Sequence, residues 1–192
     1  FTYFDSNYNL YARHFHLNVL DDRCYLVHNL GDYNSNKVLS PSCNIVNKNT
    51  LDLINKYNVK AAYLSSELSI EQMCTLGKVK TNYSKGALVY GASLMMVTKH
   101  CFISKLKSLN RTNCGSCTLN NYSIVDEYNN KMNVYARCGE CPELIIRNYK
   151  KINLIKNIKK LLNNGINRFM FVLTDETITE LDSLKKSIMN NI

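Results

Sequence analysis

Two C-x-x-C pairs constrain this chain more than any other feature of its sequence. The pairs are Cys114/Cys117 and Cys138/Cys141, and residues 118–137 lie between them. Two thiols that are two residues apart on a tight turn can point at one ion, and two such pairs complete a tetrahedral set of thiolates. A fifth cysteine, Cys101, precedes them. The pattern indicates a metal site, either zinc or an iron–sulfur centre, with a set of free thiols as the alternative.

The length of the chain suits one domain with a sizeable core. The chain has 192 residues, and we expect a single domain over residues 1–192. It starts at Phe1 rather than Met, so we expect a fragment or a processed chain. No apolar run reaches the roughly 18 residues that a membrane span needs. Five of the eight cysteines lie in one segment, which favours metal ligation in a reducing, cytoplasmic location over disulfides in a secreted domain.

The chain is strongly basic, with a formal net charge of +9. A basic balance suits polyanions such as RNA, DNA or an anionic membrane surface, and RNA is a possible partner. A cluster of lysines fits that interpretation, namely Lys150, Lys151, Lys156, Lys159 and Lys160 around one side of an expected helix. The alternative is that these lysines form an ordinary solvated surface.

Short apolar runs alternate with amphipathic segments. Strands are expected within Cys24–Asn29 and Lys37–Val46, at Lys60–Leu64, at Ala87–Tyr90 and Leu94–Val97 with a break at Gly91, and at Arg168–Leu173. Helices are expected at Thr50–Tyr57 with Thr50 as N-cap, at Ser69–Leu76 with Ser69 as N-cap and Gly77 as the stop, at Ile152–Leu162 ending at Gly165, and at Thr177–Met189. This order predicts βαβ units and a parallel sheet.

Polar side chains follow several of the expected strands. His28, Glu67, His100 and Glu176 each lie shortly after one. In a β/α barrel the carboxyl ends of the strands share the face that carries the active site. The expected βα units are too few for a closed eight-stranded barrel. We therefore predict an α/β fold that is the C-terminal part of a TIM-like barrel, completed by a missing N-terminal half or by a partner chain.

The segment at about residues 101–141 interrupts this alternation. Residues Ser123–Asp126 alternate like a strand, Asn129 and Asn130 suit a turn, and Met132–Tyr135 can pair back. Because the two cysteine pairs flank these residues, we predict a cysteine-bearing hairpin inserted into the barrel.

Glu67 and His100 are the candidate catalytic residues. A carboxylate after a buried strand can act as a general acid or base, although strands often end in polar loops with no such role. His100 can orient Cys101 or a substrate, but neighbouring residues on a strand point to opposite faces and do not form a dyad. Glu176 suits a charge at a helix N-terminus better than a catalytic role. The chain has no H-E-x-x-H or G-x-S-x-G motif, so direct peptidase chemistry has little support.

Three segments in a fixed order resemble one known family. Gly86–Gly91 reads GALVYG, Leu94–Thr98 reads LMMVT, and Cys101 follows. This order is similar to the "VYG…LM…C" run of the collagenase-like peptidase family, peptidase family U32. Together with upstream and downstream segments, the resemblance covers most of the chain.

Two downstream segments carry the resemblance further and also depart from it. Ile124–Glu127 stands at the family's hairpin motif, and Ile146–Leu154 stands at its last motif. Glu127 occupies the position of a family arginine, and Lys151 that of a proline.

The resemblance implies an α/β barrel and, as in several family branches, a four-iron, four-sulfur cluster. Carried over by position, the ligands are Cys101, Cys114, Cys117 and Cys141, with Cys138 as the alternative fourth ligand. Those branches act in oxygen-independent hydroxylation of RNA bases or of a quinone precursor. Spacing alone favours zinc instead, because the two C-x-x-C pairs close a four-ligand set without Cys101.

Three functions follow from these considerations. The favoured one is an iron–sulfur enzyme that acts in oxygen-independent hydroxylation of bases in tRNA or rRNA. The first alternative is a collagenase-like peptidase with protein substrates, which needs an activated nucleophile. The second is a zinc-stabilised RNA-binding module, which would unfold on chelation and give no redox signal.

Overall fold

The computed structural model describes residues 2–4, 10–12, 26–28, 37–107, 122–137 and 143–191. The chain divides into two compact units: a first unit of Phe1–Gly91 and Ile152–Ile192, and a second unit of Ala92–Lys151. Strands β6 (Ser84–Thr98) and β9 (Glu143–Asn153) each contribute residues to both units. Within the described part of the chain, every helix is too short or too polar to cross a membrane.

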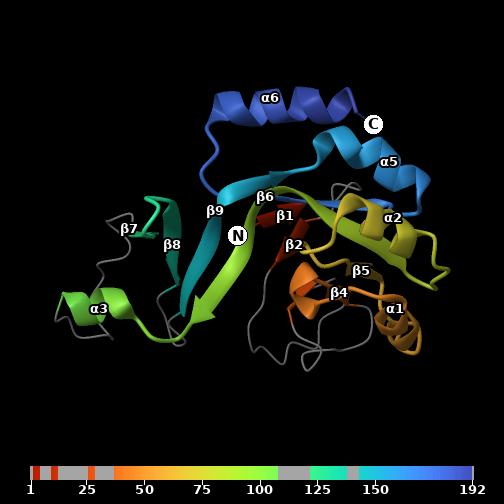
Figure 1. Ribbon diagram of the computed structural model, residues 1–192, viewed down its shortest axis with the longest axis horizontal. Coiled ribbons are helices and arrows are strands. Elements are labelled where there is room, and N and C mark those ends of the chain that lie inside the picture. Colours follow the sequence, from red (N-terminus) through yellow and green to blue (C-terminus); the bar gives the residue numbers. More distant parts are fainter. Residues whose placement is uncertain are drawn as a thin grey trace. The chain divides into compact units, whose positions relative to one another are not determined.

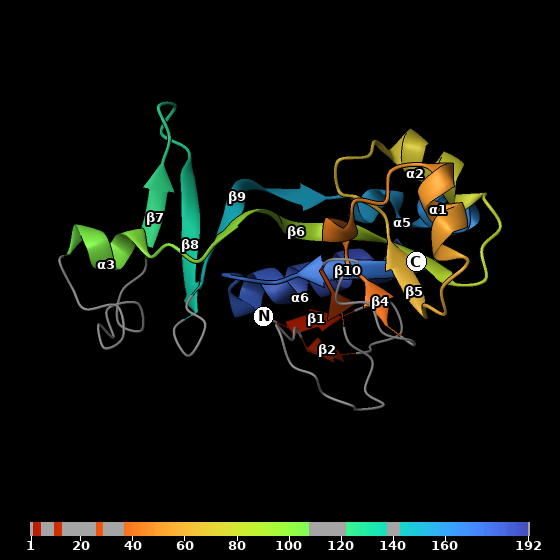
Figure 2. The same cartoon turned by 90° about the horizontal axis from the view of Figure 1, so that it is seen from below.

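The first unit is built on a mixed sheet whose central strands are parallel (Figures 1 and 2). Its strands are β1 (Thr2–Phe4), β2 (Leu10–Ala12), β3 (Leu26–Val27), β4 (Val38–Leu39), β5 (Ala61–Tyr63), the first part of β6, and β10 (Arg168–Val172). Their order across the sheet is β2-β1-β10-β6-β5-β4-β3. The strands from β10 to β3 pair in parallel, whereas β1 and β2 are antiparallel additions beside β10. The expected α/β class and parallel sheet are confirmed, and the antiparallel pair was not expected.

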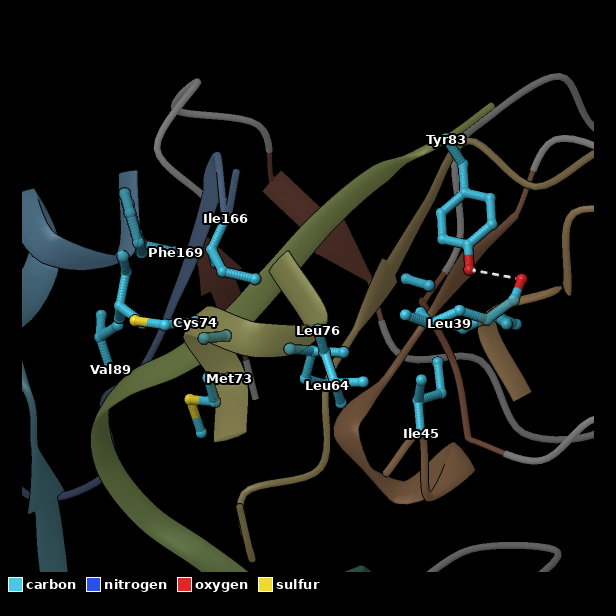
Figure 3. Packing of buried hydrophobic residues seen from close by; sticks show 14 of the residues in the cluster. Leu39, Ile45, Leu64, Met73, Cys74, Leu76, Tyr83, Val89, Ile166 and Phe169 are labelled. Carbon is cyan, nitrogen blue, oxygen red and sulfur yellow. Dashed lines mark hydrogen bonds between the residues drawn. The ribbon is translucent and has the colours of Figure 1, made fainter. Parts of the chain in front are cut away.

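Both faces of the parallel strands are apolar, as expected for strands buried on both sides. Helices α1 (Lys48–Ile54), α2 (Ile70–Gly77), α5 (Ile158–Asn163) and α6 (Ile178–Met189) pack against one face. This outer core joins strand residues such as Leu39 and Val89 to helix residues such as Met73 (Figure 3). The inner cluster, on the opposite face, consists of Leu26, Val38, Ala61, Tyr63, Leu88, Met170 and Val172.

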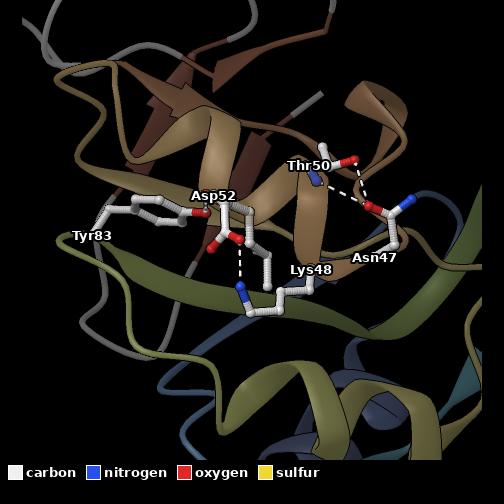
Figure 4. A network of polar contacts seen from close by, with 6 residues as sticks. Asn47, Lys48, Thr50, Asp52 and Tyr83 are labelled. Carbon is white, nitrogen blue, oxygen red and sulfur yellow. Dashed lines mark hydrogen bonds and ion pairs between the residues drawn. The ribbon is translucent and has the colours of Figure 1, made fainter.

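Helix α1 starts earlier than the sequence suggested. Its N-cap is Asn47, whose side chain accepts hydrogen bonds from the Thr50 backbone N–H at 2.9 Å and from the Thr50 hydroxyl at 3.1 Å (Figure 4). The prediction of Thr50 as the N-cap was therefore wrong, because Asn47 supplies the cap one turn earlier. Lys48 and Asp52 form an ion pair along the same helix.

The N-caps of the other two long helices agree with the sequence pattern. Ser69 caps α2 in a capping box with Gln72, and Thr177 caps α6 in a capping box with Glu180. Gly77 is the last residue of α2, and Lys78 is its C-cap. Gly77 therefore does not end the helix as a left-handed residue after its last turn. It allows close packing of α2 against the backbone at Asn164.

Helix α5 is shorter than the expected helix at Ile152–Leu162. Residues Ile152 and Asn153 still belong to β9, and a 3₁₀ turn (Ile155–Asn157) precedes the helix. The end of α5 was predicted correctly. Gly165 has the left-handed backbone conformation, with φ +86°. Its N–H donates to the Leu162 carbonyl, and the Ile166 N–H donates to the Leu161 carbonyl. These two hydrogen bonds form a Schellman motif, which ends the helix.

Strand β6 does not break at Gly91. It runs through this residue, which has φ +116° and touches β10 so closely that a β-carbon would lie 2.2 Å from the Val172 carbonyl oxygen. The register with β10 shifts just before this point, where Phe171 pairs with Tyr90. The glycine and the bulge thus bend one continuous strand and do not separate two strands.

The second unit is a small antiparallel sheet with one helix. Strand β7 (Tyr122–Val125) pairs with β8 (Lys131–Arg137), which pairs with β9, and α3 (Phe102–Leu106) lies in the same unit. The expected pairing of residues 123–126 with residues 132–135 is confirmed in large part by β7 and β8, with Asn129 at φ +63° in the turn, whereas the cysteine pairs that flank it lie outside the described residues. Its core is a cluster of four buried residues, Ile103, Val134, Leu144 and Ile146.

Candidate functional site

Cys101 is the one predicted metal ligand among the described residues. It is the N-cap of α3, and its sulfur accepts a hydrogen bond from the Ser104 backbone N–H at 3.4 Å. The Ser104 hydroxyl donates to the Cys101 carbonyl at 3.1 Å, so the two residues hold each other in place. The thiol is half-buried and packs against the core of the second unit. Hydrogen bonds to the sulfur are among the means by which proteins tune cysteine-ligated metal sites.

The other four predicted ligands lie outside the described residues. Cys114 and Cys117 fall in residues 108–121, and Cys138 and Cys141 fall in residues 138–142. Among the residues that are described, no group of three or more histidine, cysteine or acidic side chains is arranged to hold a metal ion. The donor set therefore stays a prediction from sequence.

The described residues that flank the two cysteine pairs lie at one end of the second unit's sheet. Residues 138–142 connect Arg137 to Glu143, which are cross-strand partners in β8 and β9. Residues 108–121 lie between Lys107 and Tyr122, and the Lys107 ammonium sits 5.1 Å from the centre of the Tyr122 ring.

Tyr122 begins β7 opposite Val134, which is three residues before the end of β8. Three strand residues span about 10 Å. Both cysteine-bearing segments therefore start and finish at the same end of the sheet, opposite the Asn129 turn. This arrangement suits a shared metal centre.

A second group of polar residues lies at the carboxyl ends of the parallel strands in the first unit. His28 follows β3, Ser40 follows β4, and the His28 Nδ1 atom lies 3.0 Å from the Ser40 hydroxyl oxygen. The Ser40 hydroxyl also accepts the Ser42 backbone N–H at 3.2 Å. Ser40 is fully buried, so it is a structural cap and does not resemble the exposed nucleophile of a hydrolase. Sequence reasoning had not selected Ser40.

Glu67 and Glu176, the acidic residues considered from the sequence, have different environments. Glu67 is exposed, and its backbone N–H donates to the Ser65 hydroxyl at 3.4 Å. Glu176 accepts the backbone N–H of Thr174 at 2.7 Å, just before the N-cap of α6. Its carboxylate stabilises the turn that precedes the helix.

His100 belongs to the second unit, whereas Glu67 belongs to the first. The His100 side chain is exposed, and its backbone N–H donates to the Thr98 hydroxyl at 3.1 Å. The residue directly precedes Cys101, the N-cap of α3.

The lysine cluster expected on one helix is divided by the structure. Lys150 and Lys151 lie in β9 and belong to the second unit. Lys156 belongs to the 3₁₀ turn, and Lys159 and Lys160 belong to α5 in the first unit. Lys160 also pairs with Glu71 of α2 at 3.2 Å. The prediction of one helical stripe was wrong, because the chain is still a strand at Ile152.

Comparisons with known proteins identify the family. The model of peptidase family U32 matches residues 23–170, which include His28, Glu67, His100 and all five clustered cysteines. Searches of curated proteins and of solved structures gave no significant match. The matched segment covers well over half of the chain, and the chain therefore belongs to peptidase family U32.

Proposed function

We propose that this chain carries the cluster-binding part of an iron–sulfur enzyme that acts in oxygen-independent hydroxylation of RNA bases. The observation that carries the proposal is the position of the cysteine-bearing segments. Both start and finish at one end of the second unit's sheet, and Cys101 packs against the core of the same unit. Membership of peptidase family U32 is compatible with this function.

In this proposal Cys101, Cys114, Cys117 and Cys141 hold a four-iron, four-sulfur cluster, and Cys138 is the alternative fourth ligand. Four thiolates are the usual donor set for such a cluster, and the bound cluster would supply electron transfer. The Ser104 backbone N–H donates to the Cys101 sulfur and fixes its direction. The apolar residues around Ile103 and Val134 pack against Cys101 and cover part of its side chain.

The proposed substrate is a base in tRNA or rRNA. The net charge of +9 supports an anionic partner. Within the second unit His100 would orient Cys101. Glu67, in the first unit, is the candidate general acid or base at the carboxyl ends of the parallel strands. The parallel strands of the first unit would form part of a TIM-like barrel, whose carboxyl face holds the substrate and whose other strands come from a further segment or chain.

Single cysteine variants of the anaerobically purified protein test this proposal. Cys114→Ser is expected to lose the visible absorption of the cluster, and Cys101→Ser to lose it in part or in full. Cys74→Ala is the matched control, because Cys74 is buried in the outer core of the first unit. Cys138→Ser and Cys141→Ser are compared in the same way. Only the substitution of the residue that binds the cluster should remove the visible absorption.

The same series separates the alternatives. A colourless protein that unfolds on zinc chelation, with Cys101→Ser as stable as the wild type, would indicate the zinc module. Cleavage of gelatin by the colourless protein, abolished by one substitution, would indicate a peptidase. The hydroxylase proposal requires a cluster and an RNA product whose mass is higher by one oxygen.

A further inference from the structure

Strand β6 extends beyond the two strands that flank it in the first unit. β5 pairs with it as far as Gly86, and β10 pairs with it as far as Gly91. Beyond Gly91, β9 is the one strand among the described residues that pairs with β6 (Figure 2). Because a strand has two edges, residues 92–98 keep one edge that no described strand covers. We call residues 92–98 the edge segment.

The edge segment exposes three consecutive apolar side chains. Met95 is 56% exposed, Met96 is 53% exposed and Val97 is 38% exposed. Successive side chains of a strand point to opposite faces, so apolar groups reach solvent on both faces of the sheet here. A strand that packs on a core normally buries the apolar residues of at least one face. Apolar side chains on both faces, beside an open edge, indicate a surface that another strand covers.

The edge segment lacks the residues that usually protect an edge strand. Its sequence is ASLMMVT, which contains no charged residue and no proline. The uncharged run starts upstream at Gly86, and the first charge after it is Lys99. The β-bulge in the pairing with β10 lies before the segment and does not interrupt it. Edge strands of natural proteins are generally kept apart by charges, prolines or bulges, so this strand is suited to pairing.

The absence of charge from the sequence of the edge segment selects the kind of partner. A polyanion such as RNA finds no cation on this strip, and an acidic peptide finds none either. A second copy of the chain, in contrast, presents the same uncharged apolar strip. The segment is therefore complementary to itself, which is the requirement for an interface between two copies related by a two-fold axis.

Lys99 determines the direction of such a pairing. In an antiparallel arrangement centred on Met96, Lys99 of one copy lies opposite Ser93 of the other copy. The two lysines are then six residues apart along the strands, which is about 20 Å. In a parallel arrangement in register, the two lysines would lie side by side and repel each other. The antiparallel arrangement brings the apolar side chains together and keeps the like charges apart.

We propose that the edge segment pairs antiparallel with the same segment of a second copy, so that the protein is a homodimer. The sheet β7-β8-β9-β6 of one copy then continues into that of the other. Met95, Met96 and Val97 pack against the same residues across the junction. Each copy uses its open edge, so the assembly closes at two chains. The edge segment belongs to the second unit and needs no metal, and the inference does not depend on the iron–sulfur proposal.

Sedimentation equilibrium of the 192-residue protein over a range of concentrations tests this interface. One short strand edge is a small interface, so we expect weak association. The average mass should rise from the 22.1 kDa of one chain toward twice that value. This rise is expected between about 1 and 100 µM protein. A monomer at every concentration overturns the proposal. Species that grow beyond two chains also overturn it, because a closed two-fold pairing stops at the dimer.

Charged substitutions locate the interface. Met96→Lys and Met95→Lys each place a charge on the edge segment, on opposite faces of the strand, and each variant should stay monomeric over the same range. Leu106→Lys is the matched control, because Leu106 is 82% exposed in the same unit but lies on α3. It should dimerise as the wild type does. Circular dichroism confirms that each variant is folded. A folded Met96→Lys or Met95→Lys variant that dimerises like the wild type would place the interface elsewhere and overturn the proposal.

Discussion

A β-carbon on Gly165 would lie 2.4 Å from the carbonyl oxygen of Gly77. The reverse also holds, since a β-carbon on Gly77 would lie 2.2 Å from the carbonyl oxygen of Asn164. Helices α2 and α5 therefore pack at a distance that only glycine permits, and their side-by-side arrangement is visible in Figure 1. This contact fixes the chain just before β10 and so helps to place Arg168.

Gly165→Ala is expected to destabilise the protein. The residue has φ +86°, so the substitution adds both backbone strain and a clash with Gly77. We expect a loss of about 2 kcal/mol in the free energy of unfolding, measured by urea denaturation. Asn163→Ala, at an exposed position on the same helix, should change it by less than about 0.5 kcal/mol. Equal effects of the two substitutions would contradict the packing argument.

Ser69→Ala should weaken α2 through its capping box. The Ser69 hydroxyl accepts the Gln72 N–H, and the Gln72 side chain accepts the Ser69 N–H at 2.8 Å. Loss of the hydroxyl is expected to cost about 1 kcal/mol, whereas Ser69→Gly should cost only a few tenths. Equilibrium denaturation compares the two variants. A larger loss for glycine than for alanine would show that capping is not the cause.

Lys85 should make stability depend on pH in the alkaline range. Its ammonium is buried and donates to the carbonyls of Gly77, at 2.6 Å, and Val79. Burial lowers the pKa of Lys85 below its ordinary value of 10.5. The folded protein then loses this proton at a lower pH than the unfolded chain does. Stability is therefore lower below the folded-state pKa and rises as the pH increases toward 10.5.

The matching variant is Lys85→Met, which removes the titration. The difference in unfolding free energy between wild type and variant should change as the pH rises toward 10.5, in favour of the wild type at the higher pH. Denaturation at several pH values measures it. A difference that is constant over this range would show that the lysine titrates alike in both states.

Binding of single-stranded RNA should weaken steeply with salt if the lysines contact phosphates. The logarithm of the association constant falls in proportion to the number of phosphates neutralised. Lys156→Gln and Lys159→Gln should each make this slope shallower, measured by fluorescence anisotropy. Lys48→Gln is the control, because Lys48 pairs with Asp52 on α1. If none of the three substitutions changes the salt dependence of the association constant, Lys156 and Lys159 do not contact phosphates and belong to an ordinary solvated surface.

Local signals explain which parts of the fold could be predicted. Ser69 and Gly165 were assigned correctly because each acts within its own helix. The N-cap of α1 was assigned wrongly to Thr50 because Thr50 and Asn47, which lie about one helical turn apart, are both common N-cap residues. Gly91 resembled a strand break, yet its contact is with Val172, far away in the sequence.

The spacing of apolar residues did not show correctly where the strand ends and the helix begins in the segment that starts at Ile152. Residues Ile152, Ile155 and Ile158 suit a helix, but the first ends a strand and only the last begins α5. Pairing of β9 with β6 decides this, and such pairing is a tertiary property. Periodicity over so short a run is ambiguous between the two structures.

The cysteine pairs of the candidate site were visible in the sequence, whereas the contact between His28 and Ser40 was not. Two C-x-x-C pairs are a local pattern, so they could be recognised without a fold. Ser40 is unremarkable in sequence and contacts His28 only through the pairing of β3 with β4. Register is set by packing across the sheet, which one sequence does not reveal.

The metal and acid-labile sulfide content of the anaerobically purified protein tests the central claim most directly. We expect about four irons and four sulfides per chain, with visible absorption that bleaches in air. Cys114→Ser should contain neither. One zinc per chain, with no sulfide and no colour, would contradict the account and leave the two C-x-x-C pairs as a structural zinc site.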